Sequence, residues 1–267
     1  MDFAEASVLI RFFTEIDIFL LILVRILGFL IIIPVISSAN IPNSIKVAMA
    51  VAIAYFIFIT GTIREVHYDN HLGGYVLLLV KEFIVGFAAG FVVNLIFSVF
   101  YFVGQMIDYQ IGFAMVSILD PLSQIQVPIT GNMLYLFITI MLVASGGLNA
   151  FIAAFFYSYE VIPIGSAIIV GNPTLMLYLS DVVLRFFSIG VSVALPVVGT
   201  ILILDVALGV LVKAVPQMNI FVVGMPIKVF LGLFVFMLTL PLLGGIYNFI
   251  FEESYLNIIN IIDGMSP

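Results

Sequence analysis

The longest uninterrupted apolar stretch of the chain covers residues 175–212 and reads LMLYLSDVVLRFFSIGVSVALPVVGTILILDVALGVLV. A membrane-spanning helix needs about 20 apolar residues. The stretch therefore holds one long helix, or two shorter helices that meet near Pro196. Further apolar runs cover residues 16–34, 47–63, 75–103, 133–157 and 220–251. Hydropathy thus predicts an all-α, multi-helix integral membrane protein with about six spans.

The composition supports a membrane location. Of the 267 residues, 64% are hydrophobic and 9% are charged, whereas soluble domains carry about 45–50% apolar and about 25% charged residues. A soluble globule cannot hide this much apolar surface. We therefore expect lipid or apolar protein around most of the chain, and a single membrane domain over residues 1–267.

The residue types exclude several kinds of chemistry. Cysteine is absent, which excludes disulfides, Cys-ligated zinc and thiol catalysis. His67 and His71 flank Asp69 and are the only histidines, so the further ligand that a zinc site requires is missing. The net charge of −7 argues against nucleic acid as a partner. We predict no catalytic residue, no metal and no cofactor, and hence no enzyme.

Several charged residues lie inside the apolar runs, where each costs about 2.5–3.5 kcal/mol on insertion. They are Arg25, Lys81, Glu82, Asp181, Arg185 and Asp205. Asp181 and Arg185 are four residues apart and can pair on one helix. Arg25 can pair with another helix or subunit, snorkel to the interface, or serve a proton relay. Its central position disfavours snorkelling, which suits Lys46 and Lys228 better, and a relay needs several titratable groups in series.

Small residues indicate where helices pack closely. Gly86 and Gly90 have the small-xxx-small spacing that lets two helix backbones approach each other. Ser188, Gly190 and Ser192 offer a similar surface. This pattern is frequent in membrane helices, so it predicts packing and no particular activity.

Residues 104–128 form the most unusual segment, too polar to face lipid and too apolar for a solvated loop. Irregular backbone at membrane depth is tolerated where protein or a cavity surrounds it. Phe113 and Met115 can form an apolar constriction that gates by excluding water. The alternative is an interfacial loop that packs on helix ends.

The distribution of basic residues does not orient the chain. With six spans, Arg11 and Arg64 fall on one side, and Lys46, Lys213 and Lys228 fall on the other. This difference is too small for the positive-inside rule to decide the topology. A subunit enclosed by other proteins would show such a weak bias.

Residues 214–228 read AVPQMNIFVVGMPIK and precede Gly232. This stretch strongly resembles the signature of the FliR family of flagellar type III export-gate proteins, whose injectisome counterparts form the SctT family. The resemblance runs from about Arg25 to Gly232. Its other positions are Gly28, Pro34, Glu82, Gly86, Gly90, Gly104, Asp108, Gln110, Gly112, Asp120-Pro121, Ser158-Tyr159, Pro163, Gly165 and Leu195-Pro196. Asn219, Phe221 and Gly224 follow the flagellar pattern, which favours a flagellum over an injectisome.

The resemblance implies a single-copy subunit of a helical gate in the bacterial inner membrane, at the flagellar basal body and partly raised out of the bilayer. Its partners would be FliP, FliQ, FlhB and FlhA, and its cargo unfolded flagellar proteins. Helical hairpins in residues 1–160 would form a FliP-like half, and residues 161–267 a FliQ-like half.

The resemblance also implies roles for individual residues. The central loop of this family plugs the pore, so the plug here would comprise Gln110, Gly112, Phe113, Ala114 and Met115. Contacts between helices or subunits would involve Arg25, Lys81, Glu82, Gly86, Gly90, Asp181, Arg185, Pro216, Gln217, Asn219 and Lys228.

Other functions remain as alternatives. An injectisome export-gate subunit shares the same family pattern. A secondary transporter would account for helices broken near Pro196 and Pro226. An intramembrane enzyme needs polar residues that converge at one depth, and the sequence offers no such set.

Overall fold

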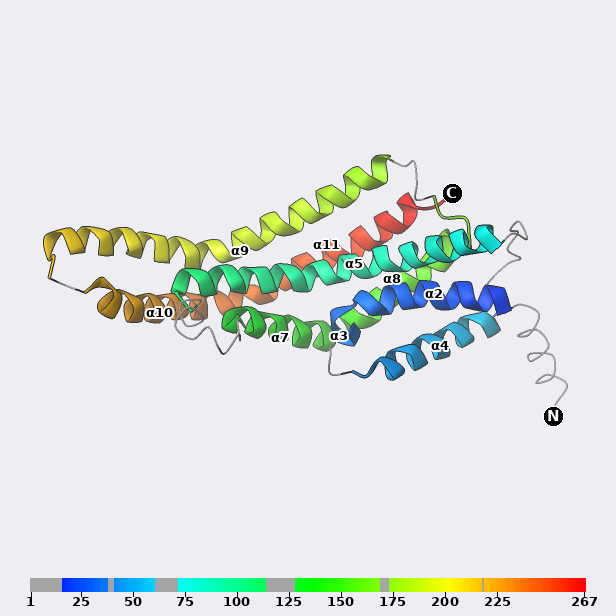
Figure 1. Ribbon diagram of the computed structural model, residues 1–267, viewed down its shortest axis with the longest axis horizontal. Helices are drawn as coiled ribbons and strands as arrows, with labels where there is room; N and C mark the ends of the chain where they lie inside the picture. The colour runs from blue at the N-terminus through cyan, green and yellow to red at the C-terminus, as the bar shows by residue number, and fades with distance from the viewer. Residues whose placement is uncertain (1–15, 38–40, 61–71, 114–127, 169–172, 218) are drawn as a thin grey trace. The chain divides into compact units, whose positions relative to one another are not determined.

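The computed structural model describes residues 16–37, 41–60, 72–113, 128–168, 173–217 and 219–267. Within these ranges every regular element is a helix (Figure 1), which confirms the predicted all-α class. The helices are α2 (Ile16–Ile32), α3 (Pro34–Ser37), α4 (Asn43–Thr60), α5 (Leu72–Ile111), α7 (Ile129–Ala144), α8 (Gly147–Val161), α9 (Pro173–Ala214), α10 (Ile220–Thr239), the 3-10 turn η1 (Leu240–Leu242) and α11 (Leu243–Gly264).

The described residues contain four helical stretches that are long and apolar enough to cross a membrane, at Asn43–Thr60, Gly73–Ile111, Leu175–Ala214 and Val222–Gly264. The bent pair α7–α8 adds a fifth if it is counted as one span. The expected count of about six also included the first apolar run. Its helix, α2, has 17 residues and is shorter than each of these four stretches.

Glycine and proline have different effects in the apolar runs at residues 133–157 and 175–212. The run at residues 133–157 breaks at Gly146, whose φ of 72° is left-handed, and α7 and α8 meet there at 72°. In contrast, α9 continues through Pro196 as one helix of 42 residues. Of the two structures that residues 175–212 allow, the chain adopts the single long helix.

The chain divides into two compact units. Unit 1 contains Met1–Asn94, Leu148–Val182 and Glu253–Pro267, and unit 2 contains Leu95–Gly147 and Val183–Glu252. Each unit draws on both expected halves, residues 1–160 and 161–267. Compact packing and the expected halves therefore divide the chain differently, and the halves stay a prediction.

In unit 1, α2 and α5 pack backbone against backbone. A β-carbon added at Gly28 would lie 2.5 Å from the carbonyl oxygen of Phe83. One added at Gly86 would overlap the carbonyl group of Arg25, and one at Gly90 would meet α2 in the same way. These glycines let the helices come close enough for their polar groups to meet directly.

In unit 2, glycines again mark the closest helix contacts. Gly104 of α5 lies against Gly131 of α7, and a β-carbon added at Gly104 would overlap the backbone of Gly131. Gly190 of α9 faces Val99 of α5, and a β-carbon there would lie 3.0 Å from the valine side chain. The last third of α5 thus contacts α7 at Gly104 and α9 at Val99.

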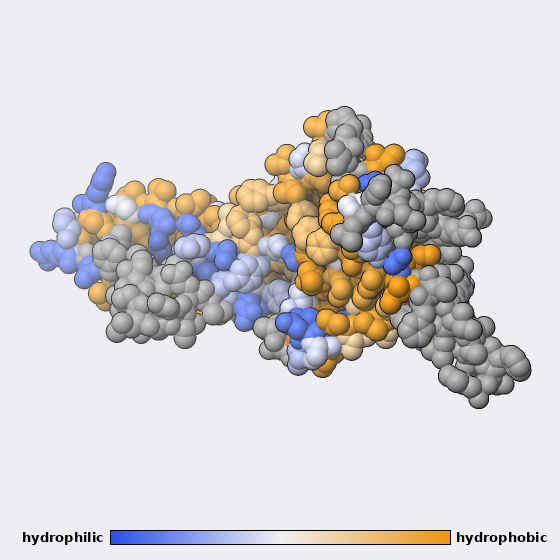
Figure 2. All heavy atoms as spheres, turned by 45° about the vertical axis from the view of Figure 1, so that its right-hand side comes forward, coloured by the Kyte–Doolittle hydropathy of each residue, from blue (hydrophilic) through white to orange (hydrophobic). Residues whose placement is uncertain are grey.

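Large apolar side chains lie exposed along the long helices. Leu177, Ile203 and Phe230 are 70%, 73% and 76% exposed, and apolar residues dominate much of the face shown in Figure 2. Exposed apolar patches of this kind mark lipid or protein contacts. This surface agrees with the membrane location that the composition predicts.

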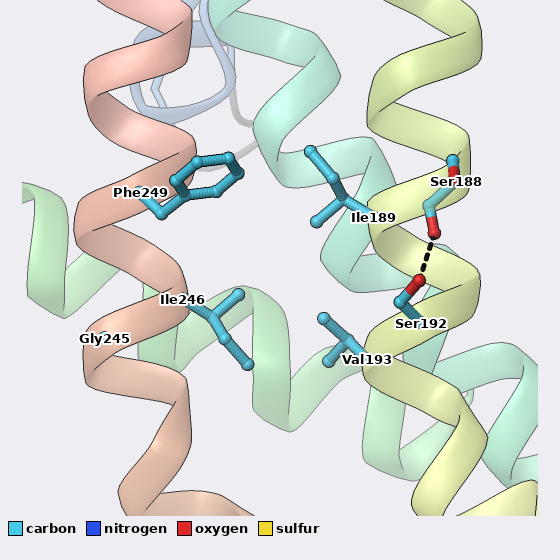
Figure 3. Close-up of a pocket in the computed structure, with 7 residues that line it drawn as sticks. All are labelled: Ser188, Ile189, Ser192, Val193, Gly245, Ile246 and Phe249. Atoms are coloured by element: carbon cyan, nitrogen blue, oxygen red, sulfur yellow. Dashed lines mark hydrogen bonds between the residues drawn. The ribbon is translucent and has the colours of Figure 1, made fainter.

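A groove of about 380 Å³ lies between α9 and α11 in unit 2 (Figure 3). Ser188, Ser192 and Gly245 are the small residues in its lining, beside apolar side chains such as Phe249. The hydroxyl of Ser192 donates to the carbonyl oxygen of Ser188 at 2.9 Å, so its hydrogen bond is satisfied within α9. The groove therefore presents a mainly apolar surface.

Candidate functional site

A buried ion pair lies at the centre of unit 1. Arg25 of α2 and Glu82 of α5 both have fully buried side chains, and Nε of Arg25 donates to Oε2 of Glu82 at 2.5 Å. The structure thus brings together two predicted contact residues that are far apart in the sequence. With no exposed surface, Arg25 does not snorkel.

The remaining donors of Arg25 meet the end of α8. Its Nη1 donates to the carbonyl oxygens of Ser158 and Ile162 at 3.1 and 3.2 Å, and Nη2 also donates to Ile162 at 3.2 Å. The last carbonyls of a helix lack intrahelical donors and carry partial negative charge, so a cation there is stabilising. The guanidinium also lies 4.5 Å from the centroid of the Tyr159 ring, within the range of a cation–π contact.

Glu82 completes this network on its other oxygen. Its Oε1 accepts the backbone N–H of Gly165 at 2.7 Å, and Gly165 has a left-handed φ of 83°. Glu82 therefore fixes the turn that follows α8, while Arg25 fixes the end of α8 itself. A buried ion pair is tolerated when further hydrogen bonds satisfy both charges, and this one ties α2, α5 and α8 together.

A second polar centre lies in unit 2, at the two ends of the segment between α5 and α7. The carbonyl oxygen of Asp108 accepts the N–H groups of Gly112 and Phe113 at 3.1 and 3.0 Å. Its carboxylate accepts the N–H of Thr130 at 3.2 and 3.0 Å. Asp108 is 5% exposed, and an anion at the N-terminus of α7 satisfies donors that the helix leaves free.

We call this region the loop neck and define it by Gly104, Asp108, Gly112, Thr130 and Gly131. Gly112 has a φ of 101°, in a region that L-residues rarely adopt. The contact of Gly104 with Gly131 brings the two helices together one turn away from Asp108. The loop neck therefore holds the end of α5 and the start of α7 side by side.

A third polar contact joins α5, α9 and α10 next to the loop neck. Nζ of Lys228 forms an ion pair with Oδ1 of Asp205. Nε2 of Gln110 lies 3.5 Å from Oδ2 of Asp205, at the limit of a weak hydrogen bond. Lys228 thus pairs with a carboxylate on the neighbouring helix instead of snorkelling from a helix end, and Gln110 lies at the same junction.

The other predicted residues are placed as follows. Lys81 is half-buried on α5, and Asp181 and Arg185 lie on exposed positions of α9, where their mutual pairing stays a prediction. Pro216, Gln217 and Asn219 are exposed between α9 and α10. Oδ1 of Asn219 accepts the N–H of Val222 at 3.4 Å, near the start of α10. Ala114, Met115, His67, Asp69 and His71 lie outside the described residues.

Reasoning from the sequence missed two of the groups that build these centres. Asp108 entered only as part of a family resemblance, because it lies within α5 and no local pattern links it to the start of α7, 22 residues away at Thr130. Asp205 was recognised as costly in an apolar run, but its partner Lys228 was not assigned to it. The spacing of the two residues across the α9–α10 connection could have suggested that pair.

Residues 16–254 match the family model described as "Bacterial export proteins, family 1". The chain belongs to this family. The predicted resemblance to FliR is thereby confirmed, and the match includes both the ion pair of unit 1 and the loop neck of unit 2.

Relatives within this family carry two kinds of name. The flagellar biosynthetic protein FliR of Bacillus subtilis is 28% identical over 213 residues, which cover 79% of this chain and 81% of the relative. FliR of Aquifex aeolicus is 30% identical over 220 residues, covering 82% and 83%. The surface presentation of antigens protein SpaR of Shigella flexneri is 28% identical over 228 residues, covering 84% and 86%.

Proposed function

We propose that the chain is a FliR-type subunit of a flagellar type III export gate. It forms part of the pore through which unfolded flagellar proteins cross the bacterial inner membrane at the flagellar basal body. Its partners are FliP and FliQ within the gate, and FlhB and FlhA beside it. Other components supply the energy, and the chain itself catalyses no reaction.

The observation that carries this proposal is the family match over residues 16–254, and the helix lengths support it. The helices α5 and α9 contain 40 and 42 residues, about twice the 20 that a span requires. Their exposed apolar side chains therefore exceed what one bilayer crossing can cover. Neighbouring apolar subunits, in a gate partly raised out of the bilayer, would cover the remainder.

Within this gate we assign the central segment to closure of the pore. The plug would begin at the end of α5, with Gln110, Gly112 and Phe113. Ala114 and Met115 would complete it. The support from the structure is the neck itself, because Asp108 fixes the direction in which the chain leaves α5. An apolar plug closes a pore by excluding water.

The experiment is complementation of a flagellated host strain that lacks its own copy of the gene. The tagged chain should restore swimming and flagellin secretion, and mild detergent should extract it in a large particle that contains FliP and FliQ. Extraction as a bare monomer that binds a small solute, with no recovery of secretion, would overturn the proposal in favour of a secondary transporter.

An injectisome gate is the second candidate, because the alignment with SpaR of Shigella flexneri covers 84% of this chain at 28% identity. The same complementation separates the two candidates. Recovery of secretion in an injectisome strain that lacks its corresponding subunit, without recovery of swimming in the flagellar strain, would favour the injectisome.

A further inference from the structure

The end of α5 packs into a three-helix junction in unit 2. Ile111, the last residue of α5, and Ile201 of α9 are both fully buried. Gly232 of α10 faces them, because a β-carbon added there would lie 2.5 Å from the Ile111 side chain and 3.4 Å from that of Ile201. This apolar layer brings the three helices together at the point where the chain leaves α5.

A polar layer lies one helical turn from the apolar layer. Asp205 follows Ile201 by four residues on α9, and Lys228 precedes Gly232 by four residues on α10. Positions four apart share one helix face, so both charges point toward the junction. Oδ1 of Asp205 pairs with Lys228, and its Oδ2 faces the amide of Gln110. One carboxylate therefore contacts both other helices.

Asp205 is the central group of this junction on energetic grounds. A single charge in an apolar segment costs about 2.5–3.5 kcal/mol, and pairing with Lys228 offsets much of this cost only while α9 and α10 stay in register. The Asp205 and Lys228 side chains are 35% and 27% exposed. Their contact is thus a partly exposed ion pair, which acts on geometry more than on overall stability.

We propose that Asp205 is a positioning residue that holds the end of α5, through Gln110, against the α9–α10 pair. Lys228 neutralises the carboxylate and sets its orientation. The pair thereby fixes Gln110, Ile111 and Gly112 at the loop neck. This inference rests on the proposed function, since it assigns Asp205 to the resting position of the first plug residues.

A disulfide measures this position directly, because the natural chain contains no cysteine. The double variant Ile111→Cys/Gly232→Cys places two thiols at the apolar layer, and the smaller side chain at 111 provides the space that the new side chain at 232 requires. In the assembled complex in living cells, oxidation should join the two residues rapidly. Adding Asp205→Asn should lower the initial rate of disulfide formation by about two- to fivefold, the change that about 0.5–1 kcal/mol produces.

The matched control is Glu252→Gln, which neutralises an exposed carboxylate on α11 of the same unit. This change should leave the disulfide rate as it is. The charge exchange Asp205→Lys/Lys228→Asp should restore most of the rate, because it rebuilds the pair between the same two helices. An effect that comes only from the loss of the aspartate side chain's own packing would not be rescued by the exchange.

The functional readout is leak of a small ion through the complex, without the cysteines. Asp205→Asn should raise this leak, and the charge exchange should lower it again. If Asp205→Asn does not assemble, Gln110→Glu tests the same contact by placing two carboxylates against each other, with the same expected increase. An unchanged disulfide rate or an unchanged leak in the assembled variant overturns the inference.

Different results would contradict the proposed function and the positioning role of Asp205. If the unmodified chain does not restore secretion to the deletion strain, the proposed function is wrong. If the unmodified chain restores secretion while the Asp205 and Gln110 variants behave as it does, only the positioning role is wrong.

Discussion

The carboxylate of Asp108 accepts the backbone N–H of Thr130 with both oxygens, at 3.2 and 3.0 Å, although the two residues are separated by the whole central segment. The same aspartate accepts two N–H groups on its main-chain carbonyl at the end of α5. One residue thus terminates one helix and caps the next. These contacts fix the two ends of the segment to each other.

Replacing Asp108 tests the loop neck. Asp108→Ala removes the cap of α7 and should destabilise the neck by about 1–2 kcal/mol, the usual cost of a lost helix cap. Asp108→Asn retains an acceptor oxygen and should lose less. The measurement is small-ion leak and flagellin secretion at matched complex levels, with leak highest for the alanine variant. Equal leak in the alanine and asparagine variants would contradict the capping role.

The ion pair of Arg25 and Glu82 should show strong coupling. Arg25→Met leaves Glu82 buried without a counter-charge, which typically costs about 3–5 kcal/mol. Glu82→Gln should also be costly, because the buried guanidinium then loses its anion while Gly165 keeps an acceptor. The double variant should be much less destabilised than the sum of the two, since neither charge remains alone.

Thermal unfolding of the purified complex measures this coupling. Lys213→Met serves as the control, because Lys213 is exposed in the last turn of α9 and its loss should have little effect. If the stability lost in the double variant equals the sum of the losses in the two single variants, Arg25 and Glu82 do not stabilise unit 1 as a coupled pair.

The glycines of α5 provide a matched comparison within one helix. At Gly86 an added methyl group would overlap the backbone of Arg25, whereas nothing lies within 4 Å of a β-carbon added at Gly73. Gly86→Ala should therefore force α2 and α5 apart and reduce assembly of the complex. Gly73→Ala should be neutral or stabilise the helix by about 0.5–1 kcal/mol.

Blue native electrophoresis of detergent extracts reports the assembled fraction for both variants. A Gly86→Ala variant that assembles as well as Gly73→Ala would show that α2 and α5 do not require backbone contact at this position.

The sequence predicted those features that depend on local patterns. The apolar run at residues 175–212 predicted a long helix, and the spacing of Gly86 and Gly90 predicted a close helix surface. Each of these two patterns lies within one element, so periodicity and composition are sufficient to detect it. The segment at residues 104–128 was expected to be an irregular loop, whereas its first part, residues 104–111, continues helix α5.

Contacts between elements could not be predicted in the same way. Arg25 and Glu82 are 57 residues apart, and nothing in the sequence says which carboxylate reaches the guanidinium. The break at Gly146 was also missed, because the run at residues 133–157 is mainly apolar and was read as one continuous span. The adjacent glycines Gly146 and Gly147 are the signal that could have revealed it.

Gly112 offers the sharpest test of the plug, because the chain contains a second glycine in a comparable state. Both Gly112 and Gly146 have left-handed φ angles, of 101° and 72°, and neither would bring an added β-carbon within 4 Å of another group. Alanine at either position should thus cost about 1–2 kcal/mol through backbone strain alone. Only Gly112 lies at the loop neck, so Gly112→Ala should raise ion leak while Gly146→Ala should lower stability without leak. Gly112→Arg, which adds bulk and charge, should disturb closure or secretion further. Unchanged swimming and unchanged leak in both Gly112 variants would remove this residue from the plug.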